Sequence, residues 1–283
     1  MRESAGSPGR ASDAETVAFL DWSIPLLRLR RSGFRNFRGT LRKRLVRRMA
    51  ELGIEGLAAY RARLEAVPEE WAVLDAICRI PISRFHRDRA VFELLAHEIL
   101  PERAEAAARD ARTSVRIWSA GCASGEEPYT VAILWHLVIA PNHPGVELDL
   151  LATDADETML ARAERRSYDE GSLRELPPGL SDVAFVRDGA FRVREELTRG
   201  VTFRREDMRV VMPDGPFDVI LCRNAAFTYF DELTQQAVAA QLVARLRSGG
   251  AIVIGAHETL PGAFESLRRR APCVYERIAE PPR

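Results

Sequence analysis

The residues from Val115 to Ala132 combine a short apolar run, a turn of small residues and the start of a helix. The turn contains Gly121 and Gly125, which adopt positive φ angles at little cost and let a ligand approach the backbone. Glu126 and Glu127 follow, where acidic side chains suit the positive end of a helix dipole. A strand, a glycine-bearing turn and a helix in this order are typical of the nucleotide-binding corner of a doubly wound sheet. The alternative is a turn with a purely structural role.

The acidic pair in this turn restricts the kind of nucleotide. Two carboxylates at a helix start repel a pyrophosphate, which that position otherwise attracts. A nucleoside that carries an amine or a sulfonium is a better match, and S-adenosylmethionine (SAM) carries both. The turn therefore predicts SAM rather than a dinucleotide or ATP.

Two further strand ends carry polar residues that could contact such a ligand. Asp154 follows an expected strand, about one strand–helix unit after the glycines, where a carboxylate accepts hydrogen bonds from both ribose hydroxyls. Asp156 is expected to cap the next helix, although the two aspartates could exchange roles. Asp207 and Met208 follow a later strand and could bind an adenine. An ordinary loop carboxylate and a core methionine are the alternative for that pair.

A fourth strand end is followed by aromatic residues. The expected strand ends in Cys222-Arg223-Asn224, and Phe227 and Tyr229 come next. In a doubly wound sheet, ligands bind outside the carboxyl ends of the strands. We therefore expect this segment to form one wall of a reaction pocket.

The elements that must position these residues alternate along the second part of the chain. Apolar runs predict strands at 115–120, 147–152, 201–204, 217–222, 251–255 and 273–278. Helical patterns lie between them at 126–138, 156–165 and 231–247. The alternation predicts an α/β fold with a doubly wound, mainly parallel sheet. Asp188-Gly189 predicts a hairpin in a small β insertion, and the strand at 251–255 is expected to begin after Ser248-Gly249-Gly250.

The first part of the chain has helical patterns only. We expect a disordered tail at 1–14, an all-α N-terminal domain at 15–90 and a linker helix at 91–112. The α/β domain would then occupy 113–283, with its β insertion at about 172–200.

The helical part contains a basic segment, Arg28 to Arg48, with no acidic residue between Asp21 and Glu51. Within it, apolar residues keep a spacing of four (Leu41, Leu45, Met49), so the basic residues take the other faces of one helix. The basic face is either solvated surface or a docking site for an acidic partner. A nucleic acid is the less favoured partner, because no recognised binding motif is present.

The totals exclude several other classes of protein. The 283 residues carry 41 basic and 41 acidic side chains, so net charge gives no argument for nucleic acid or membrane. The four cysteines lie far apart without a CxxC pair, which favours neither a disulfide framework nor a metal site. No apolar run is long enough to span a bilayer, and no signal core is present. We expect a cytoplasmic, reduced protein without membrane insertion.

Four motifs together resemble the CheR-type chemotaxis receptor methyltransferases. They are W-S-A-G-C-A-S-G-E-E-P-Y, L-A-T-D-A-D, F-D-V-I-L-C-R-N followed by Y-F-D, and L-R-S-G-G-A-I-V-I-G-A-H-E. The resemblance implies a Rossmann-like SAM methyltransferase domain with a small β-subdomain, preceded by the helical domain. It also implies SAM as the cofactor, with S-adenosylhomocysteine (SAH) as the product, and glutamate side chains of acidic receptor helices as acceptors. The basic face at Arg28–Arg48 would meet those helices, and in some members the β-subdomain docks a tethering peptide.

The resemblance also implies roles for single residues. Glu126 or Glu127, with Glu127 favoured, would hold the methionyl part of SAM, next to Gly121. Asp154 would bind the ribose, Asp207 and Met208 the adenine, and Cys222, Arg223 and Asn224 would lie beside the cofactor. Pro81 to Arg87 is similar to the family's N-x-T-x-F-F-R. Within this segment Ser83 and Arg87 would face the cofactor, with Arg87 and Tyr229 near the methyl group that is transferred.

The sequence departs from the family at several of these positions. Pro81, Ser83 and His86 replace asparagine, threonine and phenylalanine, and Asp207 stands where asparagine is usual. One extra residue separates Asn224 from Tyr229. Two alternative functions follow: the same chemistry on another protein or a small molecule, or a non-catalytic SAM-binding regulatory module.

Overall fold

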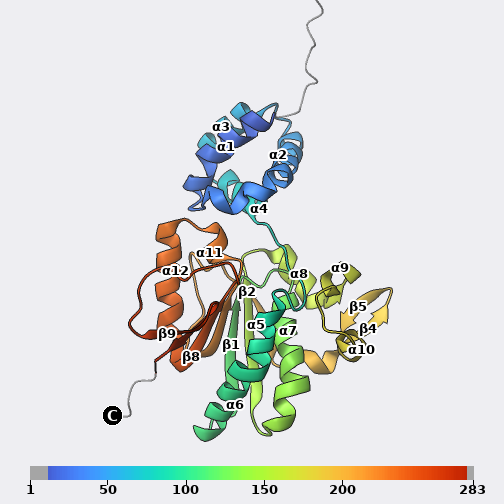
Figure 1. Cartoon of the computed structure of the whole chain (residues 1–283). Coiled ribbons are helices and arrows are strands. Elements are labelled where there is room, and N and C mark those ends of the chain that lie inside the picture. Colours follow the sequence, from blue (N-terminus) through green and yellow to red (C-terminus); the bar gives the residue numbers. More distant parts are fainter. Residues whose placement is uncertain (1–11, 279–283) are drawn as a thin grey trace, which may run out of the picture. The chain divides into compact units, whose positions relative to one another are not determined.

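The computed structural model describes residues 12–278, and these fall into two compact units (Figure 1). The helical unit extends as far as Ile80 and includes Tyr229–Glu232. The α/β unit comprises Pro81–Thr228 and the chain from Leu233 onwards. The tail expected at 1–14 lies outside the described residues up to residue 11. Ser12 to Ala14 are already ordered as the cap and first turn of a helix.

The helical unit contains four α-helices and one 3-10 helix among the described residues. They are α1 (Asp13–Leu26), η1 (Arg31–Phe37), α2 (Arg38–Leu52), α3 (Leu57–Ala66) and α4 (Glu70–Cys78). The Ser12 hydroxyl accepts a hydrogen bond from the Glu15 N–H, and the Glu15 carboxylate accepts one from the Ser12 N–H. This capping box explains why the helix begins before the expected start at Glu15.

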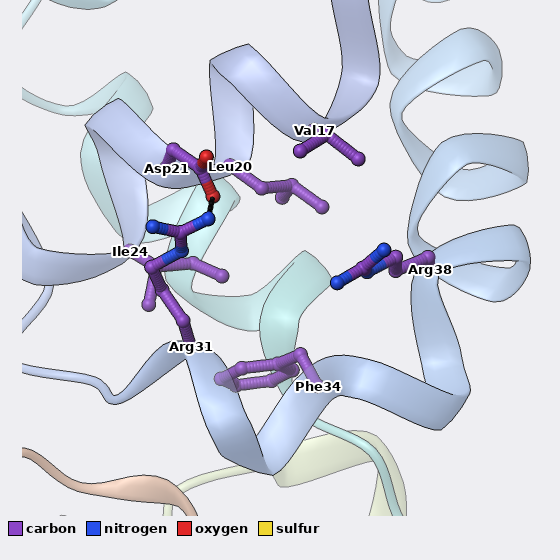
Figure 2. Close-up of a pocket in the computed structure, with 7 residues that line it drawn as sticks. All are labelled: Val17, Leu20, Asp21, Ile24, Arg31, Phe34 and Arg38. Carbon is purple, nitrogen blue, oxygen red and sulfur yellow. Dashed lines mark ion pairs between the residues drawn. The ribbon is translucent and has the colours of Figure 1, made fainter. Parts of the chain in front are cut away.

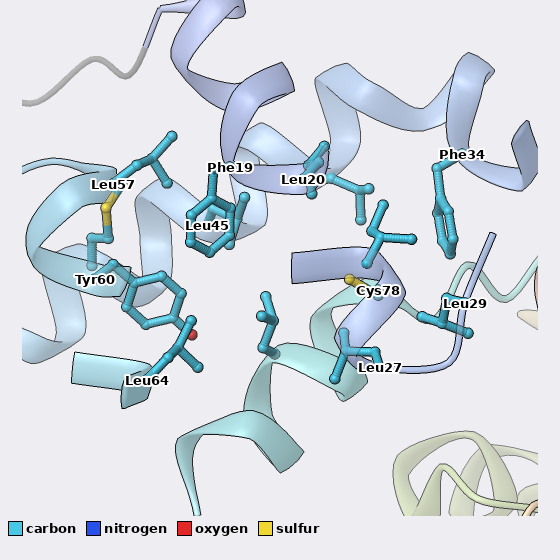
Figure 3. Packing of buried hydrophobic residues seen from close by; sticks show 14 residues of the cluster. Phe19, Leu20, Leu27, Leu29, Phe34, Leu45, Leu57, Tyr60, Leu64 and Cys78 are labelled. Carbon is cyan, nitrogen blue, oxygen red and sulfur yellow. The ribbon is translucent and has the colours of Figure 1, made fainter. Parts of the chain in front are cut away.

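The core of the helical unit forms where the apolar spacing predicts it. Leu41, Leu45 and Met49 are fully buried along one face of α2, as the spacing of four predicts. They join a cluster that includes Phe19 and Tyr60 (Figure 3). This burial, rather than the high charge of α2, stabilises the helix.

A buried ion pair also ties the helices of this unit together. The Glu70 carboxylate on α4 accepts two hydrogen bonds from the Arg48 guanidinium at 2.9 and 2.8 Å, and one from the Tyr60 hydroxyl at 2.9 Å. Arg48 holds the pKa of Glu70 below its usual value, in spite of burial. The basic side chain of Arg48 is therefore committed to the interior of its own unit.

The α/β unit is built on a seven-stranded sheet in the order β6-β2-β1-β7-β8-β10-β9 (Figure 1). The strands are β1 (Ser114–Ala120), β2 (Glu147–Asp154), β6 (Val201–Arg205), β7 (Phe217–Cys222), β8 (Leu246–Ile254), β9 (Leu267–Ala271) and β10 (Val274–Arg277). The first five in sheet order are parallel, whereas β10 is antiparallel to both neighbours. The strand order reverses between β1 and β7: successive strands are added on one side of β1 first and on its other side afterwards. In such sheets the ligand-binding crevice opens at the carboxyl ends of the two strands at this point. The expected α/β, mainly parallel fold is confirmed.

Helices cover this sheet on both faces (Figure 1). A continuous helical segment, α5 (Arg89–Leu94), η2 (Leu95–Ile99) and α6 (Leu100–Arg109), packs on β1. α7 (Glu126–Leu134) continues into η3 (Trp135–Ile139) and η4 (Ala140–Asn142), and α8 (Glu157–Arg165) packs on β2 and β6. The short α11 (Ala226–Tyr229) and α12 (Glu232–Ala244) follow β7. Among the described residues no helix is both long and apolar enough to cross a bilayer.

The expected β insertion is a three-stranded antiparallel sheet in the order β3-β5-β4. It comprises β3 (Ser167–Tyr168), α9 (Glu170–Leu173), α10 (Leu180–Ala184), β4 (Phe185–Asp188), β5 (Ala190–Val193) and η5 (Glu195–Thr198). Asp188 pairs with Ala190 across Gly189, which confirms the predicted hairpin. The rings of Phe85 and Tyr168, and of Phe85 and Phe185, meet edge to face at 4.8 and 4.9 Å. The segment at Phe85 is thereby packed into the insertion.

Two predicted boundaries were wrong, and one strand was missed. The strand expected from Ala251 already begins at Leu246 as β8, and its pairing with β7 shifts register between Phe217 and Val219. The extra residues form a bulge, with Gly249 at φ +71°, because ladder pairing with β7 continues on both sides of it. α12 consequently ends at Ala244 rather than at residue 247. The arginine-rich β9, which has no apolar alternation, was missed.

Candidate active site

The turn after β1 brings three chain segments together. The N–H groups of Gly121 and Cys122 donate to the Thr153 carbonyl on β2 at 2.8 and 3.0 Å. Gly121 has φ +80°, and a Cβ there would lie 2.9 Å from Ala225 Cβ and 3.3 Å from Met208 Cε. A side chain at this position would therefore collide with the segment after β7 and with the loop after β6. The structure therefore brings Gly121 and Met208 side by side.

The two aspartates after the glycine turn have different roles. Asp156 caps α8, since its carboxylate accepts from the N–H groups of Thr158 and Met159. Asp154 ends β2, and its carboxylate accepts from the N–H of Ala123 at 2.8 Å and of Asp156 at 2.8 Å. These bonds orient the Asp154 carboxylate beside the glycine turn, and a carboxylate has about four lone-pair positions. Acceptor capacity of this kind suits a ribose diol.

The two glutamates of the turn also differ. Glu126 is 1% exposed, and the Ser124 hydroxyl donates to its carboxylate at 2.8 Å. Glu127 is half-buried at the strand ends, where its carboxylate accepts from the Ser119 hydroxyl at 2.8 Å and from Arg223 at 3.0 Å. Glu127 is thus the more exposed of the two carboxylates, and its role at the cofactor stays a prediction.

The strand end after β7 is rigidly held. Arg223 is buried, and Asn224 adopts a left-handed φ of +53°. The Asn224 N–H donates to the Glu258 carboxylate at 2.8 Å, and so does the Gly255 N–H at 2.7 Å. The Thr228 hydroxyl adds a third bond at 2.6 Å. Asparagine adopts the left-handed region more readily than most residues, and these bonds hold it there.

Glu258 is a site residue that sequence reasoning missed. It follows β8 within the quoted G-A-H-E stretch, but nothing in its local pattern points to Asn224. Burial raises the pKa of Glu258 above its ordinary value, while the hydrogen bonds from Thr228, Asn224 and Gly255 act in the opposite direction. All three donors suit an ionised carboxylate, so Glu258 is a fixed acceptor that shapes the strand end.

Arg87 reaches this strand end from the segment before α5. Its guanidinium donates from Nη2 to Asn224 Oδ1 at 3.3 Å and from Nη1 to the Ile82 carbonyl at 2.6 Å. Ser83 lies in the same segment and is half-buried. The structure therefore places Arg87 next to Asn224, although 137 residues separate the two.

Asp207 carries a counter-ion of its own. Its carboxylate accepts from the Arg209 Nη2 at 2.6 Å, and from the Arg209 Nε at 3.0 and 3.2 Å. Arg209 thereby neutralises the extra charge that this aspartate has compared with the usual asparagine. Met208, between them, supplies the thioether next to Gly121.

Tyr229 belongs to the helical unit. Its ring packs on Phe34 at 5.4 Å, and its carbonyl accepts from the Arg30 N–H at 2.8 Å. Its predicted place near Arg87 stays a prediction.

The cysteines near the site are not poised to react. All four are free and buried. Burial raises the pKa of the Cys122 and Cys222 thiols well above the ordinary value, and nearby carboxylates add to the effect. Both thiols are therefore protonated at neutral pH and act as packing groups beside the strand ends.

These features define a class of protein. A parallel sheet with a crevice between β1 and β7, a glycine turn, an acid at the end of β2 and no phosphate-binding pattern is the arrangement of a Rossmann-like, SAM-dependent methyltransferase. The residues present fit SAM: the glycine turn ends β1 without a bulky side chain, Asp154 offers acceptor capacity, and Glu127 offers a negative charge.

Comparison with known sequences gives the family. The family model "CheR methyltransferase, SAM binding domain" matches residues 82–272. A probable chemotaxis protein methyltransferase of Rhizobium etli is 33% identical over 227 residues, which cover 77% of this chain and 83% of the relative. Chemotaxis protein methyltransferases of Borreliella burgdorferi (31% identity; 80% of this chain, 81% of the relative) and Escherichia coli (32%; 80% and 77%) are also similar. The chain belongs to the CheR methyltransferase family, and it carries that family's SAM-binding domain.

Proposed function

We propose that this protein methylates glutamate side chains on acidic helices of chemoreceptors, in the cytoplasm, with SAM as the methyl donor. The observation that carries the proposal is the shared name of the relatives, chemotaxis protein methyltransferase, over more than three quarters of this chain. The site supports the proposal, because it offers charged and polar groups that could position the cofactor and the acceptor. The reaction itself needs no catalytic base.

The chemistry makes modest demands on the protein. SAM supplies an activated methyl group on a sulfonium. A glutamate carboxylate has a pKa of about 4.3, so it is ionised at neutral pH and is already a nucleophile. Attack by its oxygen forms one C–O bond, and the electron pair of the broken C–S bond stays on sulfur. The protein must align the two reactants and exclude water, which contributes roughly 7–11 kcal/mol in the best cases.

We assign the alignment to residues at the carboxyl edge of the sheet. Asp154 and Glu127 would hold the ribose and the methionyl part of SAM, and the loop at Asp207 would hold the adenine. Arg87, placed by Asn224, would orient the incoming carboxylate through its positive charge. Tyr229 would help to exclude water.

The acceptor surface is the basic segment of the helical unit, and its side chains are not equivalent. Several are engaged within the unit: Arg31 with Asp21, Arg42 with Asp13, Arg48 with Glu70, and Arg44 with the carbonyls of Ile77 and Arg79. Arg28, Arg35, Arg38 and Lys43 are exposed and have no ion pair with any residue from 12 to 278. These four are therefore the cations available to an acidic helix.

A small pocket lies beside two of these basic residues. Its floor is apolar, with Val17, Leu20 and Ile24 from α1 and Phe34 from η1. Figure 2 shows Arg38 pointing into this pocket, across from the Arg31–Asp21 ion pair. An acidic helix that also carries an apolar side chain would find both kinds of contact here.

The test is methyl transfer from SAM to a purified cytoplasmic fragment of a chemoreceptor. We expect glutamate residues to gain the mass of one methyl group, and alkali to remove it, since esters hydrolyse and N-methyl groups do not. The double variant Arg35→Glu/Arg38→Glu should raise KM for the fragment at least about tenfold, because each reversed charge meets acidic residues of the partner. Its affinity for SAH should stay the same.

The matched control is Arg63→Glu, which reverses an exposed charge of the same unit on α3, outside the basic segment. It should leave KM unchanged. If both variants changed KM equally, the basic segment would be ordinary solvated surface and not the acceptor-binding surface. No ester on any glutamate would contradict the proposed function itself.

A further inference from the structure

The side chain of Arg223 ties the end of β7 to the segment that carries Arg87. Its side chain is 2% exposed. Nη1 donates to the Glu127 carboxylate at 3.0 Å, and Nη2 donates to the Arg87 carbonyl at 2.6 Å and to the Asp88 carboxylate at 2.9 Å. The guanidinium also lies 4.8 Å from the ring centre of Phe92 on α5. With these partners and so little exposure, the side chain is used by the protein and not by a ligand.

The segment that Arg223 holds needs an anchor. His86 and Asp88, on either side of Arg87, have left-handed φ angles of +56° and +62°. Such angles are uncommon for residues with a Cβ, although histidine and aspartate adopt them more readily than most, so contacts with the rest of the unit are needed to hold the two together. The Arg87 N–H makes a long bond of 3.4 Å to the Arg84 carbonyl, whereas the Arg87 carbonyl makes a short one to Arg223. The firm tie of this stretch to the sheet is therefore at the Arg87 carbonyl and at Asp88.

We propose that Arg223 is a positioning residue, which acts through Arg87 and Glu127 rather than on the substrates. The Nη2 of Arg223 fixes the backbone of Arg87, and the Nη1 of the same guanidinium fixes the carboxylate of Glu127. The two charged residues assigned to the acceptor and to the methionyl group are thus held at a set separation by a buried cation. The inference rests on the proposed function for the role of Arg87, but the tie itself is independent of the acceptor.

The main test variant is Asp88→Asn. It removes the charge that Arg223 binds, yet asparagine tolerates the left-handed conformation better than most residues. Arg223 keeps its bonds to Glu127 and to the Arg87 carbonyl, so the fold should survive. Arg223→Lys is the companion variant, because lysine keeps the charge but lacks the planar fork that reaches two sides. Asp110→Asn is the control, since Asp110 is an exposed partner of Arg112 at the end of α6.

The first readout is amide hydrogen exchange of the purified full chain in the presence of SAH. This measurement needs no methyl acceptor. The informative amides are those of Phe85 and His86, bonded to the Ser172 carbonyl and the Thr130 hydroxyl, and that of Val91, bonded to the Asp88 carbonyl. Asp88→Asn should speed exchange at these amides about tenfold, since a charge-assisted hydrogen bond is lost, and should leave β1 and β7 unchanged. Unchanged exchange in this segment, or a uniform rise across the sheet, would overturn the proposal.

The second readout is a double-mutant cycle on kcat with the receptor fragment. Asp88→Asn alone should lower kcat about tenfold with little change in the Kd for SAH. In an Arg87→Ala background the same change should have no further effect, because the residue through which it acts is gone. Independent, multiplying losses would indicate a merely structural role and overturn the proposal. A wild-type protein that methylates no receptor fragment would contradict the proposed function, whereas hydrogen exchange would still decide the role of Arg223.

Discussion

His86 makes stability depend on pH in a way that one substitution should remove. Its ring is 3% exposed, packs on Phe92 at 5.2 Å, and has no hydrogen-bond partner on either nitrogen among the described residues. Burial lowers the pKa of His86 from its ordinary 6.5 to about 4, and the positive charge of Arg89 adds to the effect. The ring is therefore neutral in the folded protein at physiological pH.

The sign of the effect follows from proton linkage. As pH falls below 6.5, the unfolded chain takes up a proton at this position and the folded chain does not, so folding stability declines until pH reaches about 4. Each pKa unit corresponds to about 1.4 kcal/mol, which gives a total loss of about 3 kcal/mol, with about 2 kcal/mol of it already lost at pH 5. Above pH 6.5 the group contributes no pH dependence.

The assay is urea unfolding at pH 7.5 and pH 5 for the wild type and for His86→Phe. Between pH 7.5 and pH 5 the free energy of unfolding of the wild type should fall by about 2 kcal/mol more than that of His86→Phe. Any strain of phenylalanine at the left-handed φ is the same at both pH values and cancels in the difference. His97→Gln, an exposed histidine on η2, should keep the wild-type difference. Equal losses in the wild type and His86→Phe would refute the reasoning.

Three further substitutions have outcomes that follow from the packing and hydrogen bonds described above. Gly125→Ala should destabilise the fold by about 2–4 kcal/mol in urea unfolding, because φ is +89° and the new Cβ would lie 2.7 Å from a Cβ of α8; an unchanged midpoint would show that the turn relaxes freely. Glu258→Ala should lower SAH affinity in calorimetry by at least about tenfold, since it removes the oxygen that accepts from the N–H groups of Asn224 and Gly255 and leaves these donors unpaired; an unchanged affinity would show that Glu258 does not shape the strand end. Glu70→Gln should cost about 2 kcal/mol in thermal or urea unfolding, because Arg48 loses its charge-assisted hydrogen bonds to this carboxylate and keeps the more exposed Glu51 as its ionic partner, and a loss below about 1 kcal/mol would contradict the interior role of this pair.

The sequence predicts the sheet and the crevice well for a physical reason. Strands, turns and helix starts are local signals, and parallel strands bring their carboxyl ends to one edge wherever they lie in the chain. Gly121, Asp154 and Asn224 could therefore be placed at one edge before any contact was known. The distinction between Asp154 and Asp156 was predicted from capping chemistry and is seen in the bonds to Thr158 and Met159.

Partners that are distant in sequence could not be predicted. Arg223 follows a buried strand and gives no local sign that it bonds to Asp88, 135 residues earlier. The same holds for Glu258 and Asn224, and for the basic segment, where composition does not separate Arg48 from Arg38. The bulge at Gly249 shows another limit: the strand was expected to begin only after Gly250, but pairing with β7 extends back to Leu246.

The most direct test of the account is calorimetric titration of the full chain with SAH, for the wild type, Asp154→Asn and Asp156→Asn. We expect the wild type to bind one SAH per chain, Asp154→Asn to bind at least about tenfold more weakly, because one carboxylate acceptor of the ribose is lost, and Asp156→Asn to bind like the wild type, because asparagine caps a helix nearly as well. No binding by the wild type, or equal binding by all three proteins, would contradict a SAM site at the carboxyl edge of this sheet.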